Sequence, residues 1–91
     1  MTESKVPTYK ILFTKTAQKD YENIKDSKLL RGINRILDSL KENPCQFKRL
    51  SGPFSGLRSV KTFSFRLLYE IEGTRHIVTV VSVENRKDVY R

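Results

Sequence analysis

The sequence contains no tryptophan, one histidine and one cysteine. The single cysteine, Cys45, excludes a disulfide within the chain and is typical of a reducing compartment, which predicts a cytoplasmic protein. The single histidine, His76, excludes a mechanism that needs two histidines, and no Cys/His spacing suits zinc. Since the sequence also has no P-loop and no G-x-G-x-x-G pattern, we predict neither a metal nor a cofactor.

Long apolar runs are also missing from the 91 residues. No run approaches the roughly 20 residues of a membrane span, so we expect no association with membranes. The first residues, "MTESKVPTYK", have no apolar core of a signal peptide. The hydrophobic content of 37% is that of a globular chain, and its length predicts a single domain over residues 1–91.

Positive charge is the most unbalanced property of the composition. The chain has 18 Lys and Arg against 10 Asp and Glu, a formal net charge of +8. A field of that sign attracts polyanions, either nucleic acid or an acidic protein. A basic surface without a specific ligand is the alternative interpretation.

The hydrophobic pattern predicts an α+β fold. Residues 8–14 have the composition of a strand, with Thr14 or Thr16 as the cap of a first helix. A longer helix follows, capped by Asp26 or Ser27 and stopped at Asn43-Pro44. Its apolar stripe comprises Leu30, Ile33, Leu37 and Leu40, thickened by Leu29 and Ile36.

Three more strands are predicted at residues 57–61, 65–71 and 76–83, with "EGTR" as a hairpin turn. The last strand is apolar on both parities, which indicates a central position in the sheet. We therefore expect an N-terminal strand, a two-helix hairpin and a three-stranded antiparallel meander. The helices should pack on one face of the sheet and leave the other partly open.

Arg66 is a candidate for the open face, because side chains two residues apart share a face of a strand. It shares its parity with Leu68, opposite Phe65, Leu67 and Tyr69. A charge inside such a strand is costly unless it reaches solvent or a partner. The alternative is an arginine that only extends outward or pairs with Glu70 or Glu72.

Arg86, Lys87 and Tyr90 follow the last predicted strand. Arginine binds phosphate oxygens in bidentate geometry, and aromatic rings stack on unpaired bases, so the group predicts contact with RNA. The alternative is a solvated tail, in which Glu84 and Asp88 are local ion-pair partners.

The stretch "FKRLSGPFSGLRSVKTFSFRLLYEI", followed by "IVTVVSVENRKDVYR", resembles the RelE branch of the RelE/ParE toxin superfamily. The positions that match the family pattern are Lys48, Leu50, Gly52, Gly56, Leu57, Arg66, Tyr69, Ile71, Arg86, Lys87, Asp88, Val89 and Tyr90. The resemblance implies the toxin of a type II toxin–antitoxin pair. It also implies an endoribonuclease that cuts messenger RNA in the ribosomal A site without a metal, by attack of the 2′-hydroxyl on the adjacent phosphate.

The resemblance also assigns roles and partners. Arg66 would stabilise the charge on the phosphorane, Arg86 would assist the leaving 5′-oxygen, Tyr90 would stack on the target nucleotide, and Lys61 matches a basic strand position. Further RNA contacts are expected from Lys48, Arg49, Arg58, Lys87 and Arg91. A RelB-like antitoxin would block the basic cleft, and the complex would bind its own operator DNA.

Ser59 departs from the family pattern, in which several basic residues alternate on this strand. The general base is therefore open: Lys61 and Lys48 are candidates, provided that Arg58, Arg66 and Arg86 lower a lysine pKa from about 10.4. Two other functions stay open as well. One is a non-catalytic toxin of the ParE branch that inhibits DNA gyrase, and the other is a basic nucleic-acid-binding module without activity.

Overall fold

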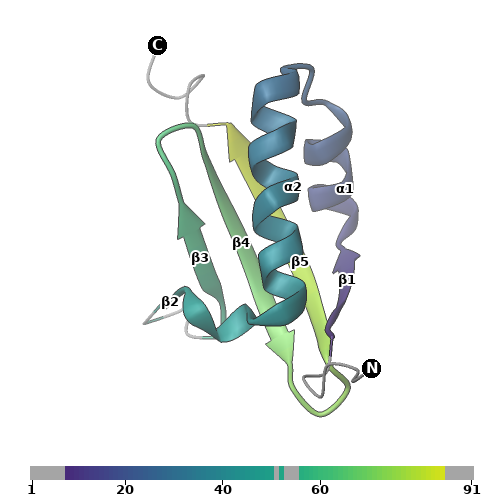
Figure 1. Ribbon diagram of the computed structural model, residues 1–91, viewed down its shortest axis with the longest axis vertical. Helices are drawn as coiled ribbons and strands as arrows, with labels where there is room; N and C mark the ends of the chain where they lie inside the picture. Colours follow the sequence, from purple (N-terminus) through teal and green to yellow (C-terminus); the bar gives the residue numbers. More distant parts are fainter. Residues whose placement is uncertain (1–7, 51, 53–55, 86–91) are drawn as a thin grey trace, which may run out of the picture.

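The computed structural model describes residues 8–50, 52 and 56–85. Strand β1 (Lys10–Phe13) precedes helices α1 (Lys15–Glu22) and α2 (Ser27–Glu42), a 3-10 turn η1 (Pro44–Gln46), and strands β2 (Lys48–Arg49), β3 (Arg58–Lys61), β4 (Phe65–Glu72) and β5 (Ile77–Asn85). Both helices lie on the same face of the sheet (Figure 1). The predicted α+β class and the order of its elements are therefore confirmed.

The two helices begin at polar caps. The Thr14 hydroxyl accepts a hydrogen bond from the Ala17 amide at 3.1 Å, and the Asp26 carboxylate accepts from the amides of Lys28 and Leu29. These bonds satisfy amides that have no partner within the helix. Of the caps that the sequence left open, the structure selects Thr14 and Asp26.

The sheet has the strand order β1-β5-β4-β3-β2. Strand β1 runs parallel to β5, and the other pairs are antiparallel. β5 is thus inside the sheet, as its continuous apolar sequence predicted. Sequence analysis predicted no strand at residues 48 and 49, but they pair with β3 as β2, opposite Ser59 and Arg58.

Along its β1 edge, the far end of β5 is held by α1 and its cap residue and not by a strand. β1 ends opposite Val80, and β5 carries a register shift just beyond it. The Thr14 hydroxyl donates to the Val81 carbonyl, and the Asp20 carboxylate accepts from the Val83 amide, each at 3.0 Å. These two side chains replace the missing strand partner, since buried backbone groups need a partner. As a result, β5 continues to Asn85, two residues past its predicted end.

The core lies between the helices and the sheet, and it contains no buried polar side chain among the described residues. The sequence placed the stripe of α2 at Leu30, but the buried residue is Leu29, and Leu30 is only half-buried. Leu29 leads to Ile33, Leu37 and Leu40 at spacings of four, four and three, which form one helix face. The core is made by this stripe, by Ala17, and by the strand residues Val60, Phe65, Leu67, Tyr69, Val78, Val80 and Val83.

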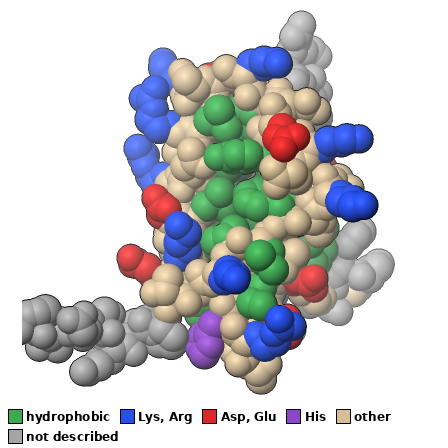
Figure 2. Space-filling model, turned by 90° about the vertical axis from the view of Figure 1, so that its right-hand side faces the viewer, with side chains coloured by type: hydrophobic (Ala, Val, Ile, Leu, Met, Phe, Trp, Pro, Cys, Tyr) green, Lys and Arg blue, Asp and Glu red, His purple; other side chains and the backbone are tan. Residues whose placement is uncertain are grey.

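The side of the molecule on which β1 and α1 lie carries hydrophobic surface. Figure 2 shows a band of hydrophobic side chains along this side, with lysines and arginines at its flanks. Leu12 of β1 contributes apolar surface, with 43% of the residue exposed. Neither helix in the described part of the chain is long and apolar enough to cross a membrane.

Candidate functional site

The helix-free face of the sheet carries the candidate site. Along β4, Phe65, Leu67 and Tyr69 are buried under the helices, whereas Arg66 and Leu68 are half-buried on the opposite face. This placement of Arg66 agrees with the alternation predicted from the sequence. Lys61 of β3 pairs directly with Arg66, and Ser59 pairs with Leu68.

A pocket of about 830 Å³ opens on this face, which we call the sheet pocket. Its lining residues are Gln46, Phe47, Lys48, Leu50, Ser59, Lys61, Arg66, Leu68 and Glu84. The lining residues lie in or next to the end of η1 and strands β2, β3, β4 and β5, so the pocket exists only in the folded sheet. Its size is within the range of pockets that bind small molecules or single groups of a larger ligand.

The charges in the sheet pocket are mostly positive. Lys48, Lys61 and Arg66 face a single carboxylate, that of Glu84. Arg66 Nη1 lies 4.0 Å from Glu84 Oε1, and 41% of the arginine side chain is exposed. An ion pair of that length and exposure contributes little energy, so the guanidinium stays available to an incoming anion. The partner of Arg66 is therefore Glu84, and not Glu70 or Glu72 as sequence analysis considered.

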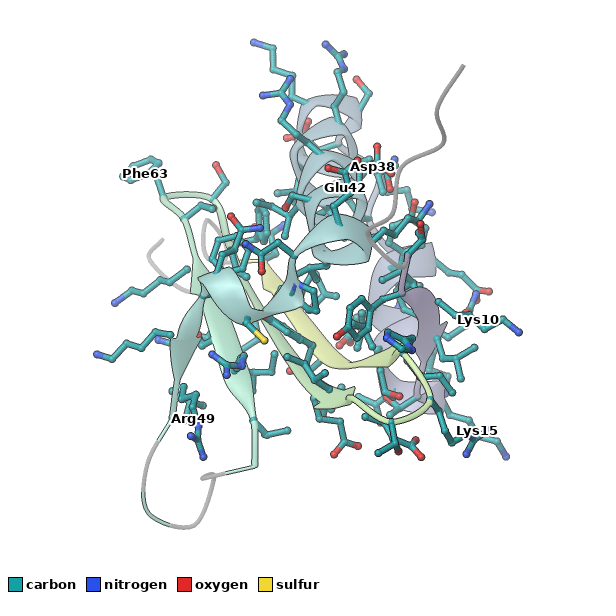
Figure 3. The ribbon with its side chains drawn as sticks, turned by 60° about the horizontal axis from the view of Figure 1, so that its bottom comes forward. Lys10, Lys15, Asp38, Glu42, Arg49 and Phe63 are labelled. Atoms are coloured by element: carbon teal, nitrogen blue, oxygen red, sulfur yellow. The ribbon has the colours of Figure 1, made fainter. Side chains whose placement is uncertain are left out.

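Two cations expected at the site lie elsewhere. Arg49 and Arg58 line a separate pocket of about 250 Å³, together with Cys45, Gly56, Leu57 and Ile71. Arg58 Nη1 donates to the carbonyl oxygens of Phe47 at 2.8 Å and Cys45 at 3.3 Å. Figure 3 shows Arg49 across the sheet from Lys10 and Lys15, which belong to the β1 side. Of the two described arginines that were expected around Lys61, Arg66 lies beside it and Arg58 does not.

The remaining predicted residues, Arg86, Lys87, Tyr90 and Arg91, lie outside the described residues. The last described residue, Asn85, pairs with Phe65, the neighbour of Arg66 in β4. The described part of β5 therefore ends next to the cationic end of the sheet pocket. Within the described ranges, no group of three or more His, Cys, Asp or Glu is arranged to hold a metal ion.

Sequence reasoning missed the apolar part of the sheet pocket. Leu68 shares the parity of Arg66 and could have been found from that signal alone. Gln46, Phe47 and Leu50 reach the sheet pocket because η1 and β2 fold back along β3. No periodicity in a stretch of seven residues indicates this return, so local sequence gave no signal for it.

The fold and the sheet pocket define a small basic α+β protein with one sheet face open to a polyanion. A family model described as the ParE toxin of type II toxin–antitoxin systems, parDE, matches residues 11–90. Because this match covers nearly the whole chain, the chain belongs to that family, within the RelE/ParE superfamily, and is a type II toxin.

Two toxins from Mycobacterium tuberculosis (strain ATCC 25618 / H37Rv) are similar in sequence. Toxin RelG is 29% identical over 84 residues, which cover 91% of this chain and 97% of RelG. Toxin RelE is 25% identical over 84 residues, covering 91% of this chain and 87% of that toxin.

Solved structures show the same fold. The RelBE2 toxin–antitoxin complex from Mycobacterium tuberculosis matches with a TM-score of 0.79 at 26% identity, covering 92% of this chain and 98% of the other. The isolated RelE toxin of E. coli matches with a TM-score of 0.73 at 24% identity, covering 90% of each chain.

Proposed function

We propose that this toxin is a ribosome-dependent endoribonuclease that cleaves messenger RNA in the A site. The observation that carries the proposal is the sheet pocket, in which Lys48, Lys61 and Arg66 lie on the sheet face opposite α1 and α2. The Arg66 side chain is 41% exposed, so its guanidinium can bind a phosphate in bidentate geometry. The similarity to toxins named RelE and RelG supports the same activity.

The proposed reaction is a transesterification that uses no metal. The 2′-oxygen attacks the adjacent phosphorus, the bond to the 5′-oxygen breaks, and a 2′,3′-cyclic phosphate forms. A base takes the proton of the 2′-hydroxyl, and the leaving 5′-oxygen receives a proton. The phosphorane between these steps carries extra negative charge, so fixed cations stabilise it more than they stabilise the substrate.

We assign Arg66 to the phosphorane, because its guanidinium is partly exposed in the sheet pocket. Lys61, directly opposite on β3, is the nearest lysine by strand pairing and the leading candidate for the base, with Lys48 as the second. Arg86 and Tyr90 keep the roles that the resemblance implies, at the leaving oxygen and the target base. The ribosome would hold the RNA in line for attack, which supplies the orientation that a small pocket lacks.

The proposal also names partners. Solved structures contain RelE-type toxins in complex with RelB antitoxins, among them RelBE2 of Mycobacterium tuberculosis and RelBE of E. coli. We propose that an acidic RelB-like antitoxin covers the sheet pocket and that the complex binds its own operator DNA. Opposite charges at such an interface should make the affinity fall as ionic strength rises. An affinity that does not change between low and high salt would contradict a charged interface.

The experiment adds the purified toxin to ribosomes programmed with a defined messenger and maps the new ends by primer extension. Cuts within the A-site codon that disappear in Arg66→Ala support the proposal. Arg75→Ala is the matched control, because Arg75 is also an exposed arginine in a pair with a glutamate, Glu72 at 3.4 Å, but lies in the turn after β4. Cuts that survive Arg66→Ala would contradict the role of the sheet pocket.

The family match bears the name ParE, which keeps DNA gyrase as the alternative target. A gyrase toxin should inhibit supercoiling while leaving the messenger intact. The same protein preparation can be tested in both assays. Inhibition of supercoiling without any RNA cut would replace the nuclease proposal, and RNA cuts without inhibition would exclude the gyrase alternative.

A further inference from the structure

Two side chains from the helix-covered side hold a segment that lines the sheet pocket. Arg58 of β3 and Tyr69 of β4 are direct cross-strand partners. The Tyr69 hydroxyl donates to the carbonyl of Pro44, and Arg58 Nη1 donates to the carbonyls of Cys45 and Phe47. Three backbone carbonyls in and just after η1 are thus bound by one pair of neighbouring side chains.

The hydroxyl of Tyr69 stays a donor at neutral pH. Tyr69 is fully buried. Burial raises the pKa of Tyr69 to about 12, although the nearby Arg58 charge acts in the opposite direction. Removing the Tyr69 hydroxyl leaves the buried Pro44 carbonyl without its partner, which costs more than losing a hydrogen bond at the surface.

The segment that these bonds hold, residues 44–50, forms one wall of the sheet pocket. Gln46, Phe47, Lys48 and Leu50 all line it. Phe47 and Leu50 are apolar, as is Leu68 on β4, whereas Lys48 is a cation. That combination fits a nucleotide, because an unpaired base packs on apolar or aromatic surface while its phosphate binds a cation.

We propose that Arg58 and Tyr69 are positioning residues that hold residues 44–50 as the base-binding wall of the sheet pocket. The identity of the ligand, an unpaired RNA nucleotide, rests on the proposed function, whereas the placement of the wall rests on hydrogen bonds in the fold. Arg58 acts on RNA through Phe47 and its neighbours, in place of the direct contact expected from the sequence.

Three variants test the two hydrogen-bond donors, the Tyr69 hydroxyl and the Arg58 guanidinium, one at a time. Tyr69→Phe removes one hydroxyl, Arg58→Met removes the guanidinium, and Arg58→Lys keeps the charge with a single donor group. Tyr21→Phe is the matched control for the tyrosine, because the Tyr21 hydroxyl donates to Asn34 Oδ1 between the two helices. Arg75→Met is the matched control for the arginine, since Arg75 pairs with Glu72 in the turn between β4 and β5.

Amide hydrogen exchange tests the placement without any assay of activity. In Tyr69→Phe and Arg58→Met, exchange at residues 46–50 should become about tenfold faster, equivalent to ~1.4 kcal/mol of local opening. Exchange at residues 77–83 of β5 should not change, and both controls should behave as the wild type. Unchanged exchange at residues 46–50, or an equal rise throughout β5, would overturn the positioning role.

Cleavage kinetics test the function of the wall. Because the wall binds substrate and transition state alike, its displacement should raise KM about tenfold and leave kcat within about twofold. Arg58→Lys should restore most of the loss. A lower kcat at constant KM would indicate fewer folded molecules and would overturn the inference. If the wild type cuts no RNA, the proposed function fails, and hydrogen exchange alone decides the positioning role.

Discussion

The two faces of the β3–β4 strand pair differ in burial and in charge. On the helix-covered face, Val60, Phe65 and Leu67 are buried in a core without polar side chains among the described residues. On the other face, Lys61 and Arg66 are neighbours across the same two strands and open to solvent. Two like charges placed directly opposite each other weaken a sheet. We therefore propose that β3 and β4 use one face for stability and the other for a ligand.

The largest expected effect is on the free energy of unfolding, and it differs between substitutions at the adjacent residues Leu67 and Arg66. Leu67→Ala should lower the free energy of unfolding by about 2–5 kcal/mol, because it opens a cavity in the core. Arg66→Ala should lower it by less than about 1 kcal/mol, since the removed pair with Glu84 is exposed. Denaturant unfolding of both variants measures the difference. Equal losses of unfolding free energy in the two variants would contradict the view that the helix-covered face supplies the stability.

The pH dependence of stability tests the helix-covered face, on which Tyr69 is buried. The pKa of Tyr69 is raised from 10.0 to about 12 in the folded state. The folded protein therefore holds this proton more tightly, so the stabilisation is complete below pH 10 and is lost between pH 10 and 12. The loss should be on the order of 2–3 kcal/mol. Unfolding curves of the wild type should fall more steeply over this range than those of Tyr69→Phe, and parallel curves would contradict the shift.

Adding a positive charge to the open face should strengthen its electrostatic binding to RNA. Ser59 lies between Lys48 of β2 and Leu68 of β4 and lines the sheet pocket. Ser59→Lys should add one phosphate contact and steepen the salt dependence of binding to single-stranded RNA by about 0.7 in the log–log slope. Fluorescence anisotropy of a labelled oligonucleotide measures it. Thr74→Lys, in the turn between β4 and β5, should leave the slope unchanged, and an equal change in both would indicate non-specific binding.

The smallest effect is expected outside both faces. Phe63 projects from the turn between β3 and β4 (Figure 3) and is 84% exposed. Phe63→Ser should change the free energy of unfolding by less than about 0.5 kcal/mol. Phe65→Ala, two residues along the chain at a buried position, provides the contrast in the same unfolding experiment. A large loss in Phe63→Ser would show that the turn belongs to the core.

Alternation and periodicity predicted much of this arrangement. The face of Arg66 followed from its parity within an apolar strand, and the central place of β5 followed from its apolar residues on both parities. The stripe of α2 was displaced by one residue at its start, because Leu29 and Leu30 are adjacent and equally apolar. Periodicity alone does not decide which of two adjacent leucines faces the core.

The parts that the sequence did not predict depend on contacts between distant segments. β2 is two residues long and forms only because β3 offers an edge, and η1 is fixed by Arg58 and Tyr69 from other strands. Arg58 was expected at the RNA because it is basic and close to the family pattern. Its position in β3 places it on the same face as Val60, where it donates to the carbonyls of Cys45 and Phe47.

The central claim is that the open face of the sheet, and Arg66 in particular, acts on RNA. The direct measurement is the single-turnover rate of messenger cleavage on programmed ribosomes by Arg66→Ala and by the control Arg75→Ala, with the melting temperature of each. We expect Arg66→Ala to be slower by about a hundredfold or more at an unchanged melting temperature, as when a group that stabilises transition-state charge is removed. Equal rates for Arg66→Ala, Arg75→Ala and the wild type would contradict the claim.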